Sequence, residues 1–441
     1  MTDTLFELTP EPNGSETSET RNGGQARMRS PIREQMEMRV VSLDDLLPPD
    51  HQARVVWDYV QRLDLSELHE KIKAVEGHAG RTPVDPAILL ALWLYATLDG
   101  VGSARELDRL CREHVAYQWI CGGVPMNYHT LSDFRTQDQD FLNRLLTQGV
   151  GGLLNTGLVK MERVAQDGMR VRASAGAASF RREERLKLLL EAAAEQVKRL
   201  SEEVDQEPGM GQRRKEAARQ RAVRERHERI VHALEEMQEL KAEKKESPRV
   251  STTDPEARVM KMADGGFRPA YNVELATDTE TQIIVGVDLT NRGSDQGQLA
   301  PMVEQLKTRY AKGPGEMLVD GGFAQKADIE TLAKAASPCK VYAPPWKPKT
   351  AGRDEYTPRD GDSAAVAEWK VRMGTTEAKA IYKERAATAE CVNAIARNRG
   401  LQQFRVRGKH KALTVVLWYA LAHNLMRSLW LQAQKEVKLA A

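Results

Sequence analysis

The chain has 441 residues, of which 41% are hydrophobic and 29% are charged. This length allows two or three domains with hydrophobic cores of their own. Lys and Arg number 65 and Asp and Glu number 63, so the net charge of +2 excludes a strongly basic protein. Any surface for nucleic acid must therefore come from local clusters of charge.

The cysteines, the N-terminus and the apolar stretches argue against a zinc-binding, a secreted or a membrane-spanning protein. The four cysteines are scattered without a CxxC pair or a matching histidine spacing, which argues against a zinc site, and we expect reduced thiols. The N-terminus is polar and acidic, unlike a signal peptide. The longest apolar stretch, from Ala87 to Leu98, is too short to span a bilayer. We expect a soluble, cytoplasmic protein that does not bind a membrane.

Residues 1–38 are rich in Thr, Ser, Glu, Gly and Pro and have almost no apolar periodicity. Such a segment cannot bury enough apolar surface to offset the cost of ordering it, so a disordered tail is predicted.

Residues 39–155 are predicted to form an all-helical N-terminal domain. Ser103 and Glu106 have the spacing of a capping box, so a helix is expected to begin at Ser103. Further helices are predicted from about Ala53, after Pro86 up to about Gly100, and from Thr130. Short helix–turn–helix connections are typical of a DNA-binding domain, but also of a helical packing or oligomerisation domain. Both interpretations stay open.

A helical hairpin is predicted at 178–250. Apolar residues recur there at helical spacing in two runs, which the sequence Asp205-Gln-Glu-Pro-Gly-Met-Gly211 separates. Its many Arg, Lys and Glu residues are more typical of a solvated surface than of a DNA contact.

Strands and helices alternate in the rest of 156–441. Strands are predicted at 163–175, 271–277, 282–290, 317–320 and 339–343, and helices at 299–310, at 325–336, from about 375 and at 412–435. The two strands at 271–290 are separated by a polar turn and read as a β-hairpin. This order predicts an α/β domain with a mixed sheet flanked by helices, into which the helical hairpin is inserted.

Three acidic residues stand out in this domain. Asp167 lies in the first strand, Asp320 ends the apolar run Met317-Leu-Val-Asp320, and Glu390 lies in the helix that begins near Thr375. Mg²⁺ prefers hard oxygen ligands, and two such ions can clamp the attacking and leaving oxygens of a phosphodiester. The three acids are therefore candidate ligands of a two-metal site for phosphoryl transfer.

From about residue 40 the chain resembles a bacterial insertion-sequence DDE transposase. The strand Val164-Ala-Gln-Asp-Gly-Met-Arg-Val-Arg-Ala173 resembles that of the first aspartate of the family, and Leu318-Val-Asp-Gly-Gly-Phe323 resembles the turn of the second. Phe267–Thr290 is similar to the middle hairpin, and Ala91–Arg135 to the helical domain that precedes the core. The resemblance implies a ribonuclease-H-like mixed-sheet catalytic core, in which these acids bind the metal ions and catalyse the reaction.

The family carries a Tyr–Arg–Glu–Lys signature around its catalytic glutamate. Tyr382, Arg385, Glu390 and Arg397 are its counterparts here, and by resemblance the Tyr and the two Arg hold the flanking phosphates. Four residues rather than the usual three separate Arg385 from Glu390, and Arg397 replaces the usual lysine. This replacement keeps the charge but changes the hydrogen-bond geometry. Glu390, Asn393 and Arg397 share one helix face.

A cluster of basic residues follows this helix. Its members, the candidate contacts to the DNA backbone, are Arg397, Arg399, Arg405, Arg407, Lys409 and Lys411. A charged connection that faces solvent is the alternative.

Four other carboxylates lie near the predicted strands. Asp278 and Asp295 have turn-like settings, and Asp288 interrupts an apolar strand. Asp254 lies in Ser251-Thr-Thr-Asp-Pro-Glu256, which is also family-like and is a candidate for support of the site. None of the four is expected to bind the metal ions directly.

The resemblance implies a DNA transposase that binds the terminal inverted repeats of its element, cleaves the strands there and joins them to target DNA. Two Mg²⁺ ions are the implied cofactor, with Mn²⁺ as a substitute, and the implied assembly on double-stranded DNA is a homodimer or larger. Two alternatives stay open: a ribonuclease-H-like nuclease that acts by hydrolysis alone, and a catalytically inactive DNA-binding derivative.

Overall fold

The computed structural model describes residues 31, 33–34, 36, 38, 40–74, 82–203, 210–243, 246–347 and 354–440. Most of the tail expected at 1–38 and most of the break at 205–211 lie outside these residues. Contacts divide the chain into Met1–Ser42 and one compact unit, Leu43–Ala441. No helix in the described part of the chain is long and apolar enough to cross a membrane.

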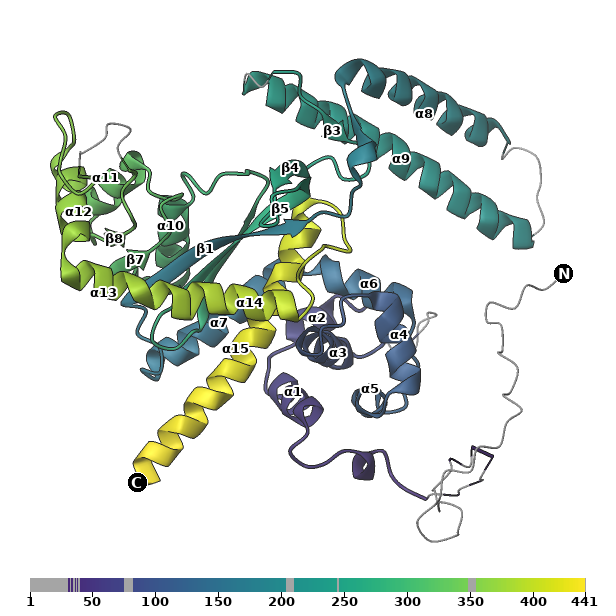
Figure 1. Cartoon of the computed structure of the whole chain (residues 1–441). Coiled ribbons are helices and arrows are strands. Elements are labelled where there is room, and N and C mark those ends of the chain that lie inside the picture. The colour runs from purple at the N-terminus through teal and green to yellow at the C-terminus, as the bar shows by residue number, and fades with distance from the viewer. Residues whose placement is uncertain are drawn as a thin grey trace, which may run out of the picture. The chain divides into compact units, whose positions relative to one another are not determined.

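The N-terminal part of the compact unit is helical, as predicted (Figure 1). Its α-helices are α1 (Gln52–Gln61), α2 (Ser66–Glu70), α3 (Pro86–Leu98), α4 (Ala104–Glu113), α5 (Val115–Cys121), α6 (Tyr128–Gln137) and α7 (Gln139–Asn155), and a 3-10 turn (Asp44–Leu46) precedes them. The Ser103 side chain accepts a hydrogen bond from the Glu106 N–H, which confirms the predicted helix start. Helix α3 is buried on all sides from Pro86 to Thr97, so it is the centre of this helical region.

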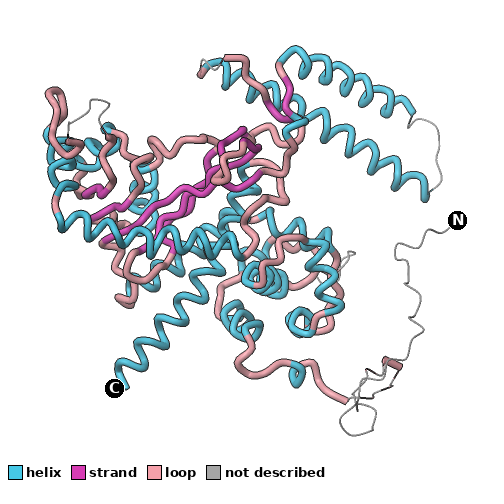
Figure 2. The backbone as a smooth tube through the Cα atoms, viewed as in Figure 1, coloured by secondary structure: helices cyan, strands magenta, loops and turns pink. Residues whose placement is uncertain are grey.

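One mixed sheet forms the second half of the core (Figure 2). Its strands are β1 (Arg163–Arg172), β4 (Arg258–Lys261), β5 (Phe267–Asp278), β6 (Ile284–Thr290), β7 (Glu316–Leu318) and β8 (Lys340–Tyr342). The strand order is β4-β5-β1-β7-β8, and β6 also pairs with β5. Strand β5 is antiparallel to β1 and β6, whereas β7 is parallel to β1 and to β8. The predicted β-hairpin is thus confirmed as β5–β6.

Helices cover both faces of β1. Side chains alternate along a strand, so Gln166 and Asp167 point to opposite faces. Gln166 contacts the first turn before α10, and Asp167 contacts the C-terminal helices. The helices of this part are α10 (Leu299–Tyr310), α11 (Lys326–Lys334), α12 (Ala364–Gly374), α13 (Thr376–Arg385), α14 (Cys391–Asn398) and α15 (Lys409–Ala440), and a π-helical turn (Ala386–Glu390) joins α13 to α14.

The predicted helical hairpin is inserted between β1 and β5 (Figure 1). It consists of a 3-10 turn (Ala177–Ser179), β2 (Phe180–Arg181), α8 (Glu183–Glu203), α9 (Met210–Ala242) and β3 (Val250–Ser251). It has a small apolar cluster of its own, in which Leu186 packs with Met237 and Leu240. An ion pair between Arg258 and Glu236 connects its second helix to β4.

Helix α15 connects the helical region to the sheet. It packs on α3, α6 and α7 and also on β6. Trp418 is 1% exposed, and its indole N–H donates to the backbone oxygen of Arg135 at 2.9 Å. The helical region and the sheet therefore share one continuous apolar core.

Three details differ from the sequence prediction. Strand β4 and helix α12 were not expected, and β7 ends at Leu318, two residues before Asp320. Strand β4 is short and mostly exposed, so its sequence has no clear alternation. Asp320 lies in a turn because its carboxylate accepts the Gly322 N–H, which bends the chain away from the strand.

Candidate active site

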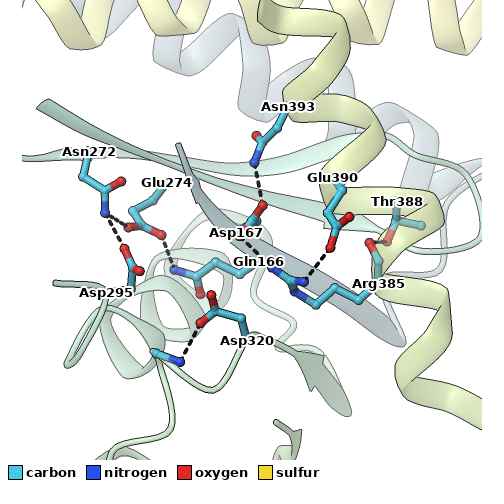
Figure 3. A network of polar contacts seen from close by, with 11 residues as sticks. Gln166, Asp167, Asn272, Glu274, Asp295, Asp320, Arg385, Thr388, Glu390 and Asn393 are labelled. Atoms are coloured by element: carbon cyan, nitrogen blue, oxygen red, sulfur yellow. Dashed lines mark hydrogen bonds and ion pairs between the residues drawn. The ribbon is translucent and has the colours of Figure 1, made fainter. Parts of the chain in front are cut away.

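The three predicted acids come from three separate elements. Asp167 lies within β1, Asp320 lies in the turn after β7, and Glu390 is the last residue of the π-helical turn. Strands β1 and β7 are parallel neighbours with Ala165 opposite Leu318, so Asp167 and Asp320 reach the same level of the sheet. Figure 3 shows the side chains of the three acids and the contacts of Arg385 with Asp167 and Glu390.

Arg385 connects two of the acids. Its Nη2 donates to Asp167 Oδ1 at 2.7 Å and its Nη1 donates to Glu390 Oε1 at 2.9 Å. The Arg385 and Asp167 side chains are 11% and 17% exposed, so this ion pair is poorly screened by water, whereas Glu390 is 54% exposed and its ion pair is screened more strongly. Asn393 Nδ2 donates to Asp167 Oδ2 at 2.8 Å. Both oxygens of Asp167 thus have donors, and α13 and α14 are fixed against β1.

The charge of Asp167 reflects opposing effects. Burial raises the pKa of its carboxyl group, Arg385 lowers that pKa, and the nearby charge of Asp320 raises it again, with a net increase. The described residues give neither Asp320 nor Asp295 an ion-pair partner like the one that Asp167 has in Arg385. Negative charge is therefore only partly compensated at this site.

The π-helical turn accounts for the unusual signature spacing. A π-helical turn bonds residues five apart and so accommodates one more residue than an α-helical turn. Arg385 and Glu390 are five apart, yet they form an ion pair on one face of the helix. Four residues between Arg385 and Glu390 can thus bring the two side chains together, as three residues do in the usual signature.

The second aspartate depends on the glycines that follow it. The Gly322 N–H donates to Asp320 Oδ1 at 2.7 Å, and a Cβ atom at Gly322 would lie 2.8 Å from that oxygen. A side chain at position 322 would therefore displace the carboxylate. Glycine at position 322 therefore leaves the space that the Asp320 carboxylate occupies.

A buried polar network lies on the face of β1 opposite to Asp167 and was missed in the sequence. Glu274 accepts from Gln166 Nε2 at 3.1 Å and from Asn272 Nδ2 at 2.7 Å, and Asn272 Nδ2 also donates to Asp295 Oδ1 at 2.6 Å (Figure 3). Glu274 is 1% exposed, and burial raises the pKa of its carboxyl group to about 8. Asn272 and Glu274 alternate with apolar residues of β5. Two polar residues on the same face of one strand were the available signal.

The predicted phosphate contacts have different settings. Tyr382 is half-buried close to the acids, whose charges act on its hydroxyl. Arg397 is exposed one turn after Asn393 on α14, and Arg399 is half-buried. Arg405, Arg407 and Lys409 are exposed on the connection to α15.

A groove of about 730 Å³ lies along that connection. It is lined by Arg405, Arg407 and Lys411, by residues of α6, and by acidic and basic residues of α9. The connection is held by the family-like segment before β4: Asp254 Oδ1 accepts from the Gly408 N–H at 3.1 Å, and Glu256 accepts from the Lys409 N–H at 2.8 Å. Asp254 thus supports the basic connection, because its carboxylate accepts hydrogen bonds from the Tyr271 hydroxyl and the Gly408 N–H.

The donor atoms at this site suit a divalent cation. Asp167, Asp320 and Asp295 offer only carboxylate oxygens, which hard cations prefer. In the described part of the chain, no group of three or more His, Cys, Asp or Glu side chains is already arranged to hold a metal ion. The Arg385 guanidinium lies between Asp167 and Glu390, so a site with all three acids requires Arg385 to release Glu390.

Two protein families match the chain. A transposase domain (DUF772) matches residues 41–137, and a transposase DDE domain matches residues 339–429. Together the two matches support an insertion-sequence DDE transposase. The first match covers the helical region of this transposase, and the second contains Glu390 and α15. No curated protein and no solved structure matches the chain.

The two transposase domains indicate a DNA transposase, an enzyme of the polynucleotidyl transferase type. Transposases of the DDE class use divalent metal ions and bind DNA. Asp167 and Asp320 lie outside both matched segments, so their roles rest on the geometry of the site.

Proposed function

We propose that this transposase binds the ends of its element and cleaves and joins DNA strands with Asp167, Asp320 and Glu390 as catalytic acids. The observation that carries the proposal is the convergence of three acids from β1, the turn after β7 and the π-helical turn, around Arg385. These acids are far apart in sequence, and a purely structural role gives no reason for so much negative charge at one place.

A ribonuclease-H-like core around this site is part of the proposal. Without the inserted hairpin, the chain runs through β1, the β5–β6 hairpin, α10, β7, α11 and β8 before the helices that carry Glu390. The antiparallel β5 and β6 lie on one side of β1 and the parallel β7 and β8 on the other. The helical region at 39–155, the catalytic domain at 156–441 and its insertion at 178–250 are the proposed functional parts.

The acids of the site are proposed to hold two Mg²⁺ ions, for which Mn²⁺ is a substitute. Such ions, when bound, supply activation of the attacking hydroxyl and stabilisation of the leaving oxygen. Asn393 holds Asp167 in place from α14. Arg385 exchanges Glu390 for a phosphate of the DNA, because a guanidinium binds a phosphate as well as a carboxylate through paired N–H donors. Tyr382 and Arg397 complete the phosphate contacts on the same helices.

The path of the DNA is proposed to continue along the basic connection before α15. Arg399, Arg405, Arg407 and Lys409 neutralise phosphates there, and cations released from DNA make such binding strongly dependent on salt. The substrates are the terminal inverted repeats and the target duplex. Joining two ends calls for a homodimer or a larger assembly.

The decisive experiment compares end binding with end cleavage in Asp167→Asn, Asp320→Asn and Glu390→Gln. Loss of an outer partner of a metal ligand already costs about 10- to 100-fold. We therefore expect each variant to lose more than about 100-fold in cleavage of a labelled element end, with end binding retained. Glu377→Gln removes an exposed acid from α13 and is the matched control. Full cleavage by any of the three variants would contradict the site.

The same assay separates the alternatives. A transposase joins a labelled 3′-hydroxyl end to a target plasmid, whereas a nuclease that acts by hydrolysis alone releases cut ends without joined product. Protein that binds ends but cuts none of them in Mg²⁺ or Mn²⁺ is a catalytically inactive derivative.

A further inference from the structure

Asp295 lies in the loop between β6 and α10, close to the second catalytic aspartate. A Cβ atom at Gly322 would lie 2.8 Å from Asp320 Oδ1 and 3.5 Å from Asp295 Oδ2. Asp295 Oδ1 lies 2.6 Å from the corresponding Cβ position at Gly168, which is on the Gln166 side of β1 and not on the Asp167 side. Two glycines thus leave the space that Asp295 occupies.

The orientation of Asp295 is fixed by a neutral partner. Asn272 is fully buried in β5 and donates to Asp295 Oδ1 at 2.6 Å. Asn272 is in turn held by Glu274, which Gln166 of β1 also contacts. A side chain that only capped the loop would not need an anchor across two central strands. Asn272 thus holds Oδ1 of Asp295, and Oδ2 lies beside Gly322, as Asp320 Oδ1 does.

Two features at this place indicate a missing positive charge. Among the described residues, Asp295 and Asp320 lie close together without a salt bridge, and Arg385 and Arg170 act on Asp295 only through longer-range charge. The Asn272 Oδ1 and Gln166 Oε1 atoms are buried without a hydrogen-bond partner. Partly buried like charges are costly unless a cation compensates them.

We propose that Asp295 is a fourth carboxylate of the active site and binds a divalent cation together with Asp320, positioned by Asn272. This inference rests on the proposed function, because it adds a ligand to the site proposed there. It differs from the sequence analysis, which placed Asp295 in a turn without a direct role. The Asp320–Asp295 pair is not blocked by Arg385, whose two bonds go to Asp167 and Glu390. It is therefore available to a cation before DNA binds.

The test measures Mn²⁺ binding to the full-length protein without DNA, from the electron paramagnetic resonance signal of free Mn²⁺. We expect Asp295→Asn to weaken Mn²⁺ binding about tenfold or more, because even an outer partner of a ligand contributes that much. Asp288→Asn removes a carboxylate from the neighbouring strand β6 and should leave the affinity within about twofold, because it removes the same formal charge without touching the pair.

A second variant keeps both acids. Gly322→Ala places a methyl group 2.8 Å from Asp320 and 3.5 Å from Asp295, and should weaken Mn²⁺ binding as well. It decides the case if Asp295→Asn does not fold. Wild-type affinity in Asp295→Asn, wild-type affinity in Gly322→Ala, or wild-type protein that binds no Mn²⁺ without DNA overturns the inference. The proposed function would survive each of these results, because it is tested by cleavage.

Discussion

Arg385 gives the site its present geometry. A single guanidinium neutralises part of the charge of Asp167 and Glu390 and connects the helical segment to β1. The same guanidinium lies between Asp167 and Glu390. A cation that is part of the protein therefore stabilises Asp167 and Glu390, and the proposed function requires it to rearrange before the three acids act together.

Glu274 predicts a pH dependence of stability. Its pKa is raised to about 8 by burial and by the nearby charges of Asp295, Asp167 of β1 and Asp288 of β6, from an ordinary value of 4.5. The folded protein thus keeps a proton that the unfolded chain releases, so the free energy of unfolding falls as the pH rises from about 4.5 to 8. Glu274→Gln stays neutral and avoids this loss. We therefore compare the free energy of unfolding of Glu274→Gln with that of wild type at each pH. The difference, variant minus wild type, should be larger at pH 8.5 than at pH 5.5 by about 1–3 kcal/mol.

The measurement is urea unfolding of both proteins in EDTA at the two pH values. The exposed Glu280, in the turn of the same hairpin, provides the control Glu280→Gln, which should shift the curves equally at both pH values. The change in protonation of His423, whose pKa is lowered to about 4 by burial, is common to all the proteins and cancels. An equal difference between Glu274→Gln and wild type at pH 5.5 and 8.5 would show that Glu274 is not protonated in the folded protein.

At this scale the sequence was informative about residues with a local motif. The site position of Asp320 was predictable, because an aspartate followed by two glycines after an apolar run is typical of a tight turn at the end of a strand. That of Asp295 was not, because its place beside Asp320 depends on how the loop after β6 folds back over Gly168. Asn393 was placed on the right face of its helix, but its bond to Asp167 required the packing of α14 on β1.

At the scale of elements, the π-helical turn explains why Arg385 and Glu390 are one residue further apart than usual. The turn contains Ala386 and Ala387, which are exposed, and Thr388, whose hydroxyl donates to the Glu384 backbone oxygen at 2.9 Å. π-helical turns occur as local bulges within α-helices, frequently at functional sites. Sequence periodicity alone predicted one continuous helix, because 3.6-residue spacing gives no signal for a local change of hydrogen bonding.

Deletion of Ala386 tests this explanation. The deletion leaves Arg385 and Glu390 four residues apart, a spacing that also brings side chains together on an α-helix. We expect end cleavage within about tenfold of wild type and a change in the free energy of unfolding below about 1 kcal/mol. The measurements are the cleavage assay and thermal unfolding by circular dichroism.

Deletion of Ala394 is the matched control, since it removes an exposed alanine from the regular helix α14. Every later residue then turns by about 100°, which separates the buried Val392 from the buried Ala396 on the shared face. We expect loss of stability and of cleavage. Equal damage from both deletions would mean that the π-helical turn is required as such.

At the scale of the whole molecule, the two family matches are far apart in sequence but meet in space. Helix α15 belongs to the second matched segment, and it packs on α3, α6 and α7 of the helical region. The apolar patterns predicted both the N-terminal helices and the helix at 412–435. Their contact was not predictable, because periodicity shows that a helix face is buried without showing which partner covers it.

This shared core predicts that the helical region and the sheet unfold together. Trp418 is 1% exposed, contacts the helical region through the Arg135 backbone oxygen, and lies near Phe134, with ring centres 6.2 Å apart. Trp418→Ala should lower the free energy of unfolding by about 3–5 kcal/mol, because it leaves a cavity and an unpaired carbonyl group. Trp430→Ala is the matched control on the same helix. Trp430 is 48% exposed, so its replacement should cost less than about 1 kcal/mol.

Hydrogen exchange followed by mass spectrometry in increasing urea reports α3 and β1 separately, and both should lose protection at the same urea concentration in Trp418→Ala. If α3 stays protected after β1 has opened, the helical region is a domain that folds by itself, and α15 only attaches the catalytic part to it.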